Sequence, residues 1–157
     1  LKDLIVGSIS GEPNITVFPN DEGYSGLVIQ SGIPIVSMCA HHNLAFTGYA
    51  TVAYVPAENV IGLSKLNRIV EHFGRRGAIQ EQLTAAIHQA VDKVCEGNKG
   101  VIVTVVATHN CVSCRGIKHQ GAAMVTTKAS GVFMDNNNLV RKEFFDSLKI
   151  NNGGHQI

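Results

Sequence analysis

Two short stretches of the chain carry the side chains best suited to metal binding and proton transfer. The stretch SMCAHHNLAF, residues 37–46, contains Cys39, His41 and His42. The stretch THNCVSCRG, residues 108–116, contains His109, Cys111 and Cys114. Zinc binds thiolates and imidazoles, and a catalytic zinc takes three protein ligands and leaves a fourth position for water. A Cys/His/Cys set drawn from both stretches would meet that requirement.

Residue types alone leave other interpretations open. A structural site with four ligands also fits, formed by Cys39, His42, Cys111 and Cys114, although it would give His41 and His109 no role. Buried cysteines beside hydrogen-bonded histidines are also common without any metal. We favour a metal site because both stretches fall at the ends of predicted strands.

The strands are indicated by β-rich and alternating segments. Residues 27–38 predict one strand, in which Pro34 suits an edge position or a bulge. The alternating GYATVAYVP predicts a second strand, which pairs with the first and leaves the first Cys/His stretch at their connection. VIVTVVATH is the most strongly predicted strand and ends at His109, and residues 121–133 predict another after a turn.

Helical periodicity marks the segment between the two strand pairs. Apolar residues at helical spacing predict an amphipathic helix from Leu63, Leu66, Val70 and Phe73, and a longer one from Ile79, Leu83, Ile87, Val91 and Val94. We expect Leu63, Val70, Leu83 and Val91 in the core and Cys95 as a packed thiol. A short helix is expected within residues 136–148. This order of elements predicts an α+β fold with an antiparallel sheet.

Composition limits the possible partners. The 157 residues suit one domain, with 45% hydrophobic and 16% charged residues. A net charge of +1 gives no general attraction to nucleic acid, and no apolar run is long enough to cross a membrane. The four cysteines are too sparse for a small disulfide scaffold, so we expect a reducing, cytoplasmic setting.

Five motifs follow one another in a specific order and spacing: CAHHNLAFTGYATVAYVP, VIGLSKLNRIVEHFGRR, IQEQLT, THNCVSCRGI and TTKASGVF. Together they resemble the GTP cyclohydrolase I family, and the resemblance covers roughly residues 27–148. It implies the tunnelling fold, an antiparallel four-stranded sheet with two helices packed on one face. It also implies assembly into a ring-shaped homodecamer with active sites between subunits. We expect the catalytic domain at residues 27–150, a tail at 151–157, and an irregular segment at 1–26 in which the family's usual helical region is short or absent.

The resemblance also assigns roles at the metal site. The family motif C-x-H-H matches residues 39–42, which implies zinc ligation by Cys39 and His42, with Cys111 as the third ligand. His41 and His109 are then the acid/base groups. The implied reaction opens the imidazole ring of guanine in GTP by hydrolysis, releasing formate and 7,8-dihydroneopterin 3'-triphosphate. The folate, biopterin and 7-deazaguanine pathways all begin with this step.

Substrate contacts follow from the same resemblance. Glu81 matches the guanine-binding acid, with Gln80 beside it, whereas position alone would explain a glutamate near a helix start by the helix dipole. The implied triphosphate contacts are Ser64, Lys65, Arg68 and Arg115. Without the resemblance, Lys65 and Arg68 would be interpreted as part of a solvated helix face.

One position departs from the family pattern. A glutamate usually stands between the cysteine and the first histidine of the motif, where this chain has Ala40. This departure leaves two alternative functions open. One is a catalytically weakened, zinc-containing module that binds purines or pterins. The other is another tunnelling-fold enzyme of 7-deazaguanine metabolism, although the nitrile reductases of that class lack the Cys/His ligand pair.

Overall fold

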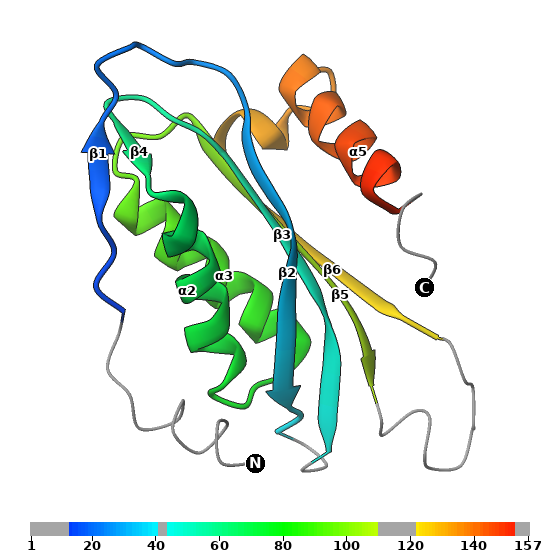
Figure 1. The fold of residues 1–157 in the computed structure, drawn as a ribbon. Coiled ribbons are helices and arrows are strands. Elements are labelled where there is room, and N and C mark those ends of the chain that lie inside the picture. The colour runs from blue at the N-terminus through cyan, green and yellow to red at the C-terminus, as the bar shows by residue number, and fades with distance from the viewer. Residues whose placement is uncertain (1–12, 41–43, 110–121, 153–157) are drawn as a thin grey trace.

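A four-stranded antiparallel sheet forms the centre of the molecule (Figure 1). The structure is a computed structural model that describes residues 13–40, 44–109 and 122–152. The strands are β2 (Val28–Met38), β3 (Ala45–Val55), β5 (Gly100–His109) and β6 (Met124–Ala129). They lie in the order β2-β3-β5-β6, and every neighbouring pair is antiparallel. The predicted α+β fold with an antiparallel sheet is confirmed.

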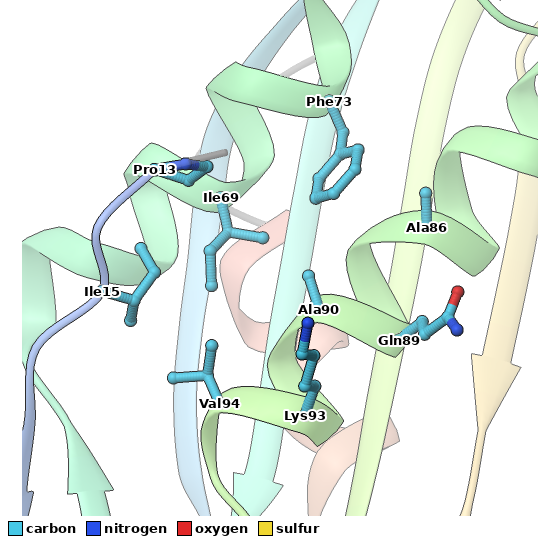
Figure 2. A pocket seen from close by; sticks show the side chains of 9 residues that line it. All are labelled: Pro13, Ile15, Ile69, Phe73, Ala86, Gln89, Ala90, Lys93 and Val94. Carbon is cyan, nitrogen blue, oxygen red and sulfur yellow. The ribbon is translucent and has the colours of Figure 1, made fainter. Parts of the chain in front are cut away.

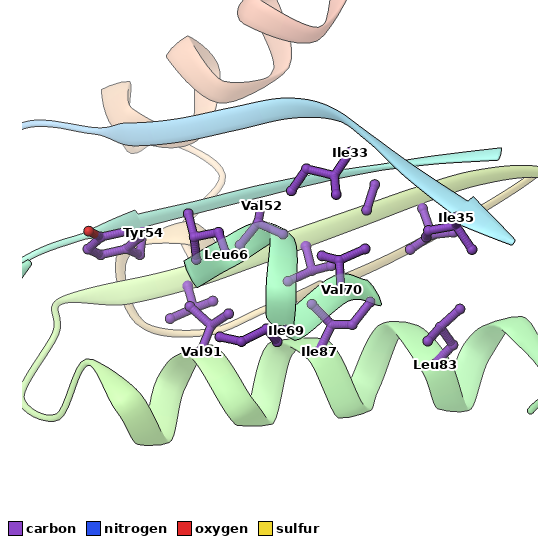
Figure 3. Packing of buried hydrophobic residues seen from close by; sticks show 14 of the residues in the cluster. Ile33, Ile35, Val52, Tyr54, Leu66, Ile69, Val70, Leu83, Ile87 and Val91 are labelled. Carbon is purple, nitrogen blue, oxygen red and sulfur yellow. The ribbon is translucent and has the colours of Figure 1, made fainter. Parts of the chain in front are cut away.

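Two helices cover one face of this sheet and form the main core with it (Figure 3). Helix α2 (Leu63–Gly74) buries Leu66, Ile69 and Val70, and helix α3 (Gln80–Val94) buries Leu83, Ile87 and Val91. These residues recur every three or four positions, so each helix presents one apolar stripe to the strands. They pack against alternate side chains of β2, β3 and β5, because a strand directs every second residue to the same face.

The opposite face of the sheet is covered near one end. The 3₁₀ helix η1 (Gly131–Met134) and helix α5 (Leu139–Asn152) place Phe133 and Phe144 against Ala53, Val55 and Ile102. Strand β5 is therefore buried on both faces over its first residues, which explains its continuous apolar sequence. Helix α5 ends at Asn152, beyond the residues from which the short helix was predicted.

The edge strand β2 contains the predicted irregularity. Its pairing with β3 shifts register between Gln30 and Ile33, where Gly32 has a φ of 69°. Glycine tolerates that backbone angle because it has no Cβ. Pro34 follows on the same edge strand, where a residue without an N–H group costs least.

A separate two-stranded ribbon lies beside helix α2. Strand β1 (Val17–Pro19) pairs antiparallel with β4 (Asn59–Ile61). The sequence predicted an irregular segment around β1 and gave no sign of β4, because three residues are too few to establish an alternating pattern. The ribbon ends next to α2, since the N–H of Gly62 donates to the carbonyl of Thr16.

Two predictions about packing have different outcomes. Cys95 is fully buried, and its thiol donates to the carbonyl of Asn59 at 3.2 Å, as expected for a packed cysteine. The prediction that Leu63 lies in the core is wrong, because its side chain is 79% exposed. Leu63 is the first residue of α2 and falls one turn before the part of the apolar stripe that contacts the sheet. Within the described residues, no helix combines the length and apolar character needed to cross a bilayer.

Candidate active site at one end of the sheet

Cys39 and His109 lie at the same end of the central sheet although seventy positions separate them in the sequence. Strand β2 ends at Met38, opposite Ala45, and the N–H of Cys39 donates to the carbonyl of Leu44 at 2.8 Å. Strand β5 ends at His109, opposite Phe46 on β3. Antiparallel pairing therefore brings the start of each Cys/His stretch to the same end of the sheet, as predicted from the strand ends.

His109 is held between an aromatic ring and an amide. Its imidazole stacks on the ring of Phe46, with centroids 4.5 Å apart and planes inclined by 15°. Its Nε2 lies 2.7 Å from Oε1 of Gln80. Burial lowers the pKa of His109 below its ordinary value, and the negative charge of Glu81 opposes this effect. The neutral imidazole is therefore the dominant form near neutral pH.

Gln80 links the first turn of α3 to two strands. Its side chain is 1% exposed. Its amide Nε2 lies 3.1 Å from the carbonyl oxygen of Val105, 2.9 Å from that of Met124 and 3.2 Å from Oγ1 of Thr126. Thr84, one turn later, donates to the carbonyl of Gln80 at 2.9 Å and lies 2.6 Å from the Thr126 hydroxyl. The polar groups of this contact are thus paired within the protein.

Glu81 follows Gln80 and is exposed in the first turn of α3. Its position suits a carboxylate because the first turn of a helix carries partial positive charge. Its charge also acts on His109, as the pKa of that histidine reflects. Among the sequence-predicted site residues, the described structure therefore brings together Cys39, Gln80, Glu81 and His109.

The predicted triphosphate contacts on α2 lie at the other end of the sheet. Asn67 accepts a hydrogen bond of 2.7 Å from Gln30 near the start of β2, whereas Gly74, the last residue of α2, lies beside Val36 near the end of that strand. Ser64, Lys65 and Arg68 belong to the first half of this helix. An extended strand from Gln30 to Cys39 covers roughly 30 Å, so one chain does not bring these three side chains to His109.

Several predicted site residues lie outside the described residues. They are His41, His42, Cys111 and Arg115, together with the alternative ligand Cys114. Among the residues that the structure does describe, no three histidine, cysteine or carboxylate side chains gather as a metal site. Of the predicted ligand set, the described residues contain one member, the buried Cys39.

A groove away from this end of the sheet contains none of the candidate residues. It has a volume of about 360 Å³ and lies between α2, α3 and the segment before β1. Figure 2 shows Phe73, Ile69 and Ala90 along its apolar walls, with Lys93 at its border. The titratable and nucleophilic groups around His109 make the sheet end the better candidate for catalysis.

Sequence reasoning missed three residues of the site. The sequence assigned no role to Phe46, the last residue of the first Cys/His stretch, or to Thr84 and Thr126. One signal was present in the sequence: Phe46 follows the Cys/His connection at the start of the next strand. Thr84 and Thr126 are 42 positions apart in the sequence, and their hydroxyls lie 2.6 Å apart only in the folded chain. The sequence therefore does not show that Phe46 stacks on His109 or that Thr84 contacts Thr126.

A solved structure has a similar fold. It matches the crystal structure of the archaeosine synthase QueF-Like in the apo form with a TM-score of 0.56 at 19% identity, over 68% of this chain and 94% of that one. This likeness shows the tunnelling fold.

Sequence comparisons give the family. The GTP cyclohydrolase I family model matches residues 5–149. GTP cyclohydrolase 1 of Edwardsiella ictaluri is 40% identical over 87% of this chain and 61% of its own length. GTP cyclohydrolase 1 of Histophilus somni is 42% identical, over 87% of this chain and 62% of the relative. The chain belongs to the GTP cyclohydrolase I family, and it spans about three-fifths of the length of these curated relatives.

Proposed function

We propose that the protein is a zinc-dependent GTP cyclohydrolase I that hydrolyses GTP to formate and 7,8-dihydroneopterin 3'-triphosphate. The observation that carries this proposal is the grouping of Cys39, Glu81 and His109 at one sheet end in a chain of this family. The group supplies one candidate metal ligand, one carboxylate and one imidazole. Ring opening by hydrolysis requires those three kinds of group.

The donor set suits zinc. Cys39, His42 and Cys111 would supply two thiolates and an imidazole, which zinc favours over harder cations. The buried position of Cys39 at a sheet end restricts its side chain to few orientations, as a metal ligand requires. When bound, zinc would supply the Lewis acidity that makes water a nucleophile near neutral pH.

The protein side chains would then bind the base and move protons. Glu81 would accept hydrogen bonds from N1–H and the exocyclic amine of guanine, with Gln80 beside it. His109, whose pKa is lowered by burial, would exchange a proton with the imidazole ring of the base. His41 would assist opening and rearrangement of the ribose.

The triphosphate contacts support a multi-subunit site. Ser64, Lys65 and Arg68 are separated from His109 within one chain by most of the sheet's length, and Arg115 would join them on GTP. A neighbouring subunit in a ring, which we propose to be a homodecamer, would bring them to the catalytic end. The uncovered sheet face near that end carries the exposed apolar side chains Val36, Tyr49 and Val125, as expected of a surface that a second subunit covers.

The domain organisation and setting complete the proposal. Residues 27–150 form the catalytic domain, flanked by segments 1–26 and 151–157. Thiolate ligands remain available in a reducing compartment, so we place the enzyme in the cytoplasm. Its product would enter tetrahydrofolate biosynthesis and one-carbon metabolism, or the related biopterin or 7-deazaguanine routes.

Zinc content and base selectivity together test this function. We expect about one zinc per chain, lost in Cys39→Ser and Cys111→Ser but kept in Cys114→Ser. The Glu81→Gln variant should keep zinc and lose turnover of GTP. In equilibrium binding it should also lose the preference for GTP over inosine triphosphate, which lacks the exocyclic amine. Full zinc in Cys111→Ser would refute the ligand set, and unchanged kinetics in Glu81→Gln would refute the guanine contact.

A further inference from the structure

The amide of Gln80 has a defined orientation. Its nitrogen end faces the carbonyl oxygens of Val105 and Met124, at 3.1 and 2.9 Å. A carbonyl oxygen only accepts hydrogen bonds, so the side-chain NH₂ must occupy that end. The oxygen end is therefore the one that lies 2.7 Å from Nε2 of His109. A reversed amide would set its oxygen against two backbone carbonyls and lose both bonds.

This orientation determines which nitrogen of His109 carries the proton. The amide oxygen has no hydrogen to donate, so Nε2 of His109 must be the N–H donor in the contact. In the neutral imidazole only one ring nitrogen is protonated. The lone pair of the neutral ring is therefore on Nδ1. The stacking of the imidazole on Phe46 fixes the plane of the ring and hence the direction of Nδ1.

The backbone and threonine contacts hold the amide rigidly. Gln80 is the first residue of α3, and Thr84 binds its carbonyl one turn later. The hydroxyls of Thr84 and Thr126 are 2.6 Å apart, and Thr126 also lies 3.2 Å from the Gln80 amide nitrogen. The helix start is thus tied to both β5 and β6. Rotation of the amide away from His109 would break several buried hydrogen bonds at once.

We propose that Gln80 is a positioning residue that holds Nε2 of His109 as the N–H donor and so fixes the tautomer and orientation of this imidazole. The role rests on the proposed function, and it differs from the direct substrate contact that the sequence predicted for Gln80. A side chain that is 1% exposed and bonded to two strands is better placed to act through His109 than on GTP itself.

The ¹⁵N spectrum of the imidazole tests the tautomer without any variant of Gln80. Protein labelled with ¹⁵N-histidine is measured at a pH where the ring is neutral, and the His109 signals are assigned by their loss in His109→Ala. We expect a protonated Nε2 and an unprotonated Nδ1. A ring protonated on Nδ1 would overturn the proposal, whether or not the protein turns over GTP. This measurement therefore separates failure of the positioning role from failure of the proposed function.

Kinetics of Gln80→Met test the consequence for the reaction. Methionine keeps the volume and removes the hydrogen bonds, and Gln82→Met is the matched control because Gln82 is exposed on the same helical turn. We expect mixed tautomers in Gln80→Met, and kcat lower by roughly tenfold to a hundredfold, since positioned proton transfer contributes 10²–10⁴-fold. KM for GTP and zinc content should not change, and Gln82→Met should behave as the unmodified protein. A higher KM with unchanged kcat would show direct substrate binding by Gln80 and overturn the proposal, as would an unchanged tautomer ratio.

Discussion

The imidazole of His109 stacks on the fully buried ring of Phe46, its cross-strand partner at the end of the sheet. The two rings belong to β5 and β3, and the strand pairing places them directly opposite each other. The stack joins the hydrophobic core directly to the candidate catalytic histidine. It therefore has consequences for both stability and turnover, which two phenylalanine variants separate.

Phe46→Leu should lower both the free energy of unfolding and kcat. Loss of the buried ring should reduce the free energy of unfolding by about 1–2 kcal/mol, as for other buried large-to-small changes. Because the imidazole would lose its flat neighbour, kcat should fall as well. Urea unfolding and steady-state kinetics measure the two effects.

Phe144→Leu is the control for that variant. Phe144 is equally buried but packs in the second cluster, on the other face of the sheet. It should lose similar stability and keep kcat. Equal losses of kcat in both variants would mean that the stack has no specific role.

The close approach of β3 and β5 beside this stack predicts a strict requirement for Gly48. A Cβ on Gly48 would lie 1.9 Å from the carbonyl oxygen of Val106 and 2.6 Å from Cα of Ala107. Backbone atoms of a central strand cannot move aside cheaply, so Gly48→Ala should cost on the order of 3 kcal/mol.

Gly74→Ala provides the contrast. Its Cβ would meet nothing closer than 3.7 Å, at the carbonyl of Val36. Since alanine favours helices over glycine, this variant should gain about 0.5–1 kcal/mol. Thermal unfolding of both variants checks the pair, and a tolerated Gly48→Ala would contradict the strand spacing described for β3 and β5.

His88 should make stability fall in mild acid. Burial lowers its pKa, although Asp92 and a hydrogen bond to the backbone of Val101 act in the opposite direction. Above about pH 6.5 the imidazole is neutral in both the folded and the unfolded chain. As the pH falls below that value, the unfolded chain binds the proton more readily, so folding loses stability until the folded-state pKa is passed.

His88→Gln removes this contribution. The difference in unfolding free energy between the unmodified protein and the variant should shrink as the pH falls from 7.5 to 5.5, when both are measured by urea unfolding. A difference that stays constant with pH would show that His88 does not titrate with folding. The His88 contact with the Ser130 hydroxyl at 3.0 Å accounts for any difference that persists at the higher pH.

Separation of Lys65 from His109 predicts complementation between subunits. Lys65→Ala and His109→Ala should each be inactive alone. Hybrid oligomers formed by co-expression should regain activity, because a site between subunits can take each intact residue from a different chain. Glu81→Gln with His109→Ala is the control pair, since both residues lie at the same end of one chain. Absence of activity in both mixtures would contradict shared sites.

Most of the fold could be predicted from the sequence because its elements are strongly periodic. The stripes of α2 and α3 and the apolar run of β5 each identify a type of element and a buried face. The three-residue strand β4 has no such pattern. The exposure of Leu63 depends on where α2 passes the end of the sheet, which the periodicity of the helix does not contain.

The candidate site was predictable to a smaller extent. Residue types and strand ends predicted that Cys39 and His109 lie at one end of the sheet, and the antiparallel pairing places both strand ends there. The contact between Gln80 and His109 depends on the docking of α3 against β5 and β6, which involves residues far apart in sequence. The sequence therefore indicated that Gln80, beside Glu81, contacts the base. The hydrogen bonds of Gln80 itself follow only from the three-dimensional packing.

Release of formate from GTP labelled at C8 tests the central claim most directly. The zinc-loaded protein is incubated with GTP carrying the label at that carbon, and labelled formate and the pterin triphosphate are quantified together. We predict equal amounts of the two products, and none from His109→Ala. Zinc-loaded protein that binds GTP but releases no labelled formate would contradict the cyclohydrolase function, and would favour a purine-binding or pterin-binding module.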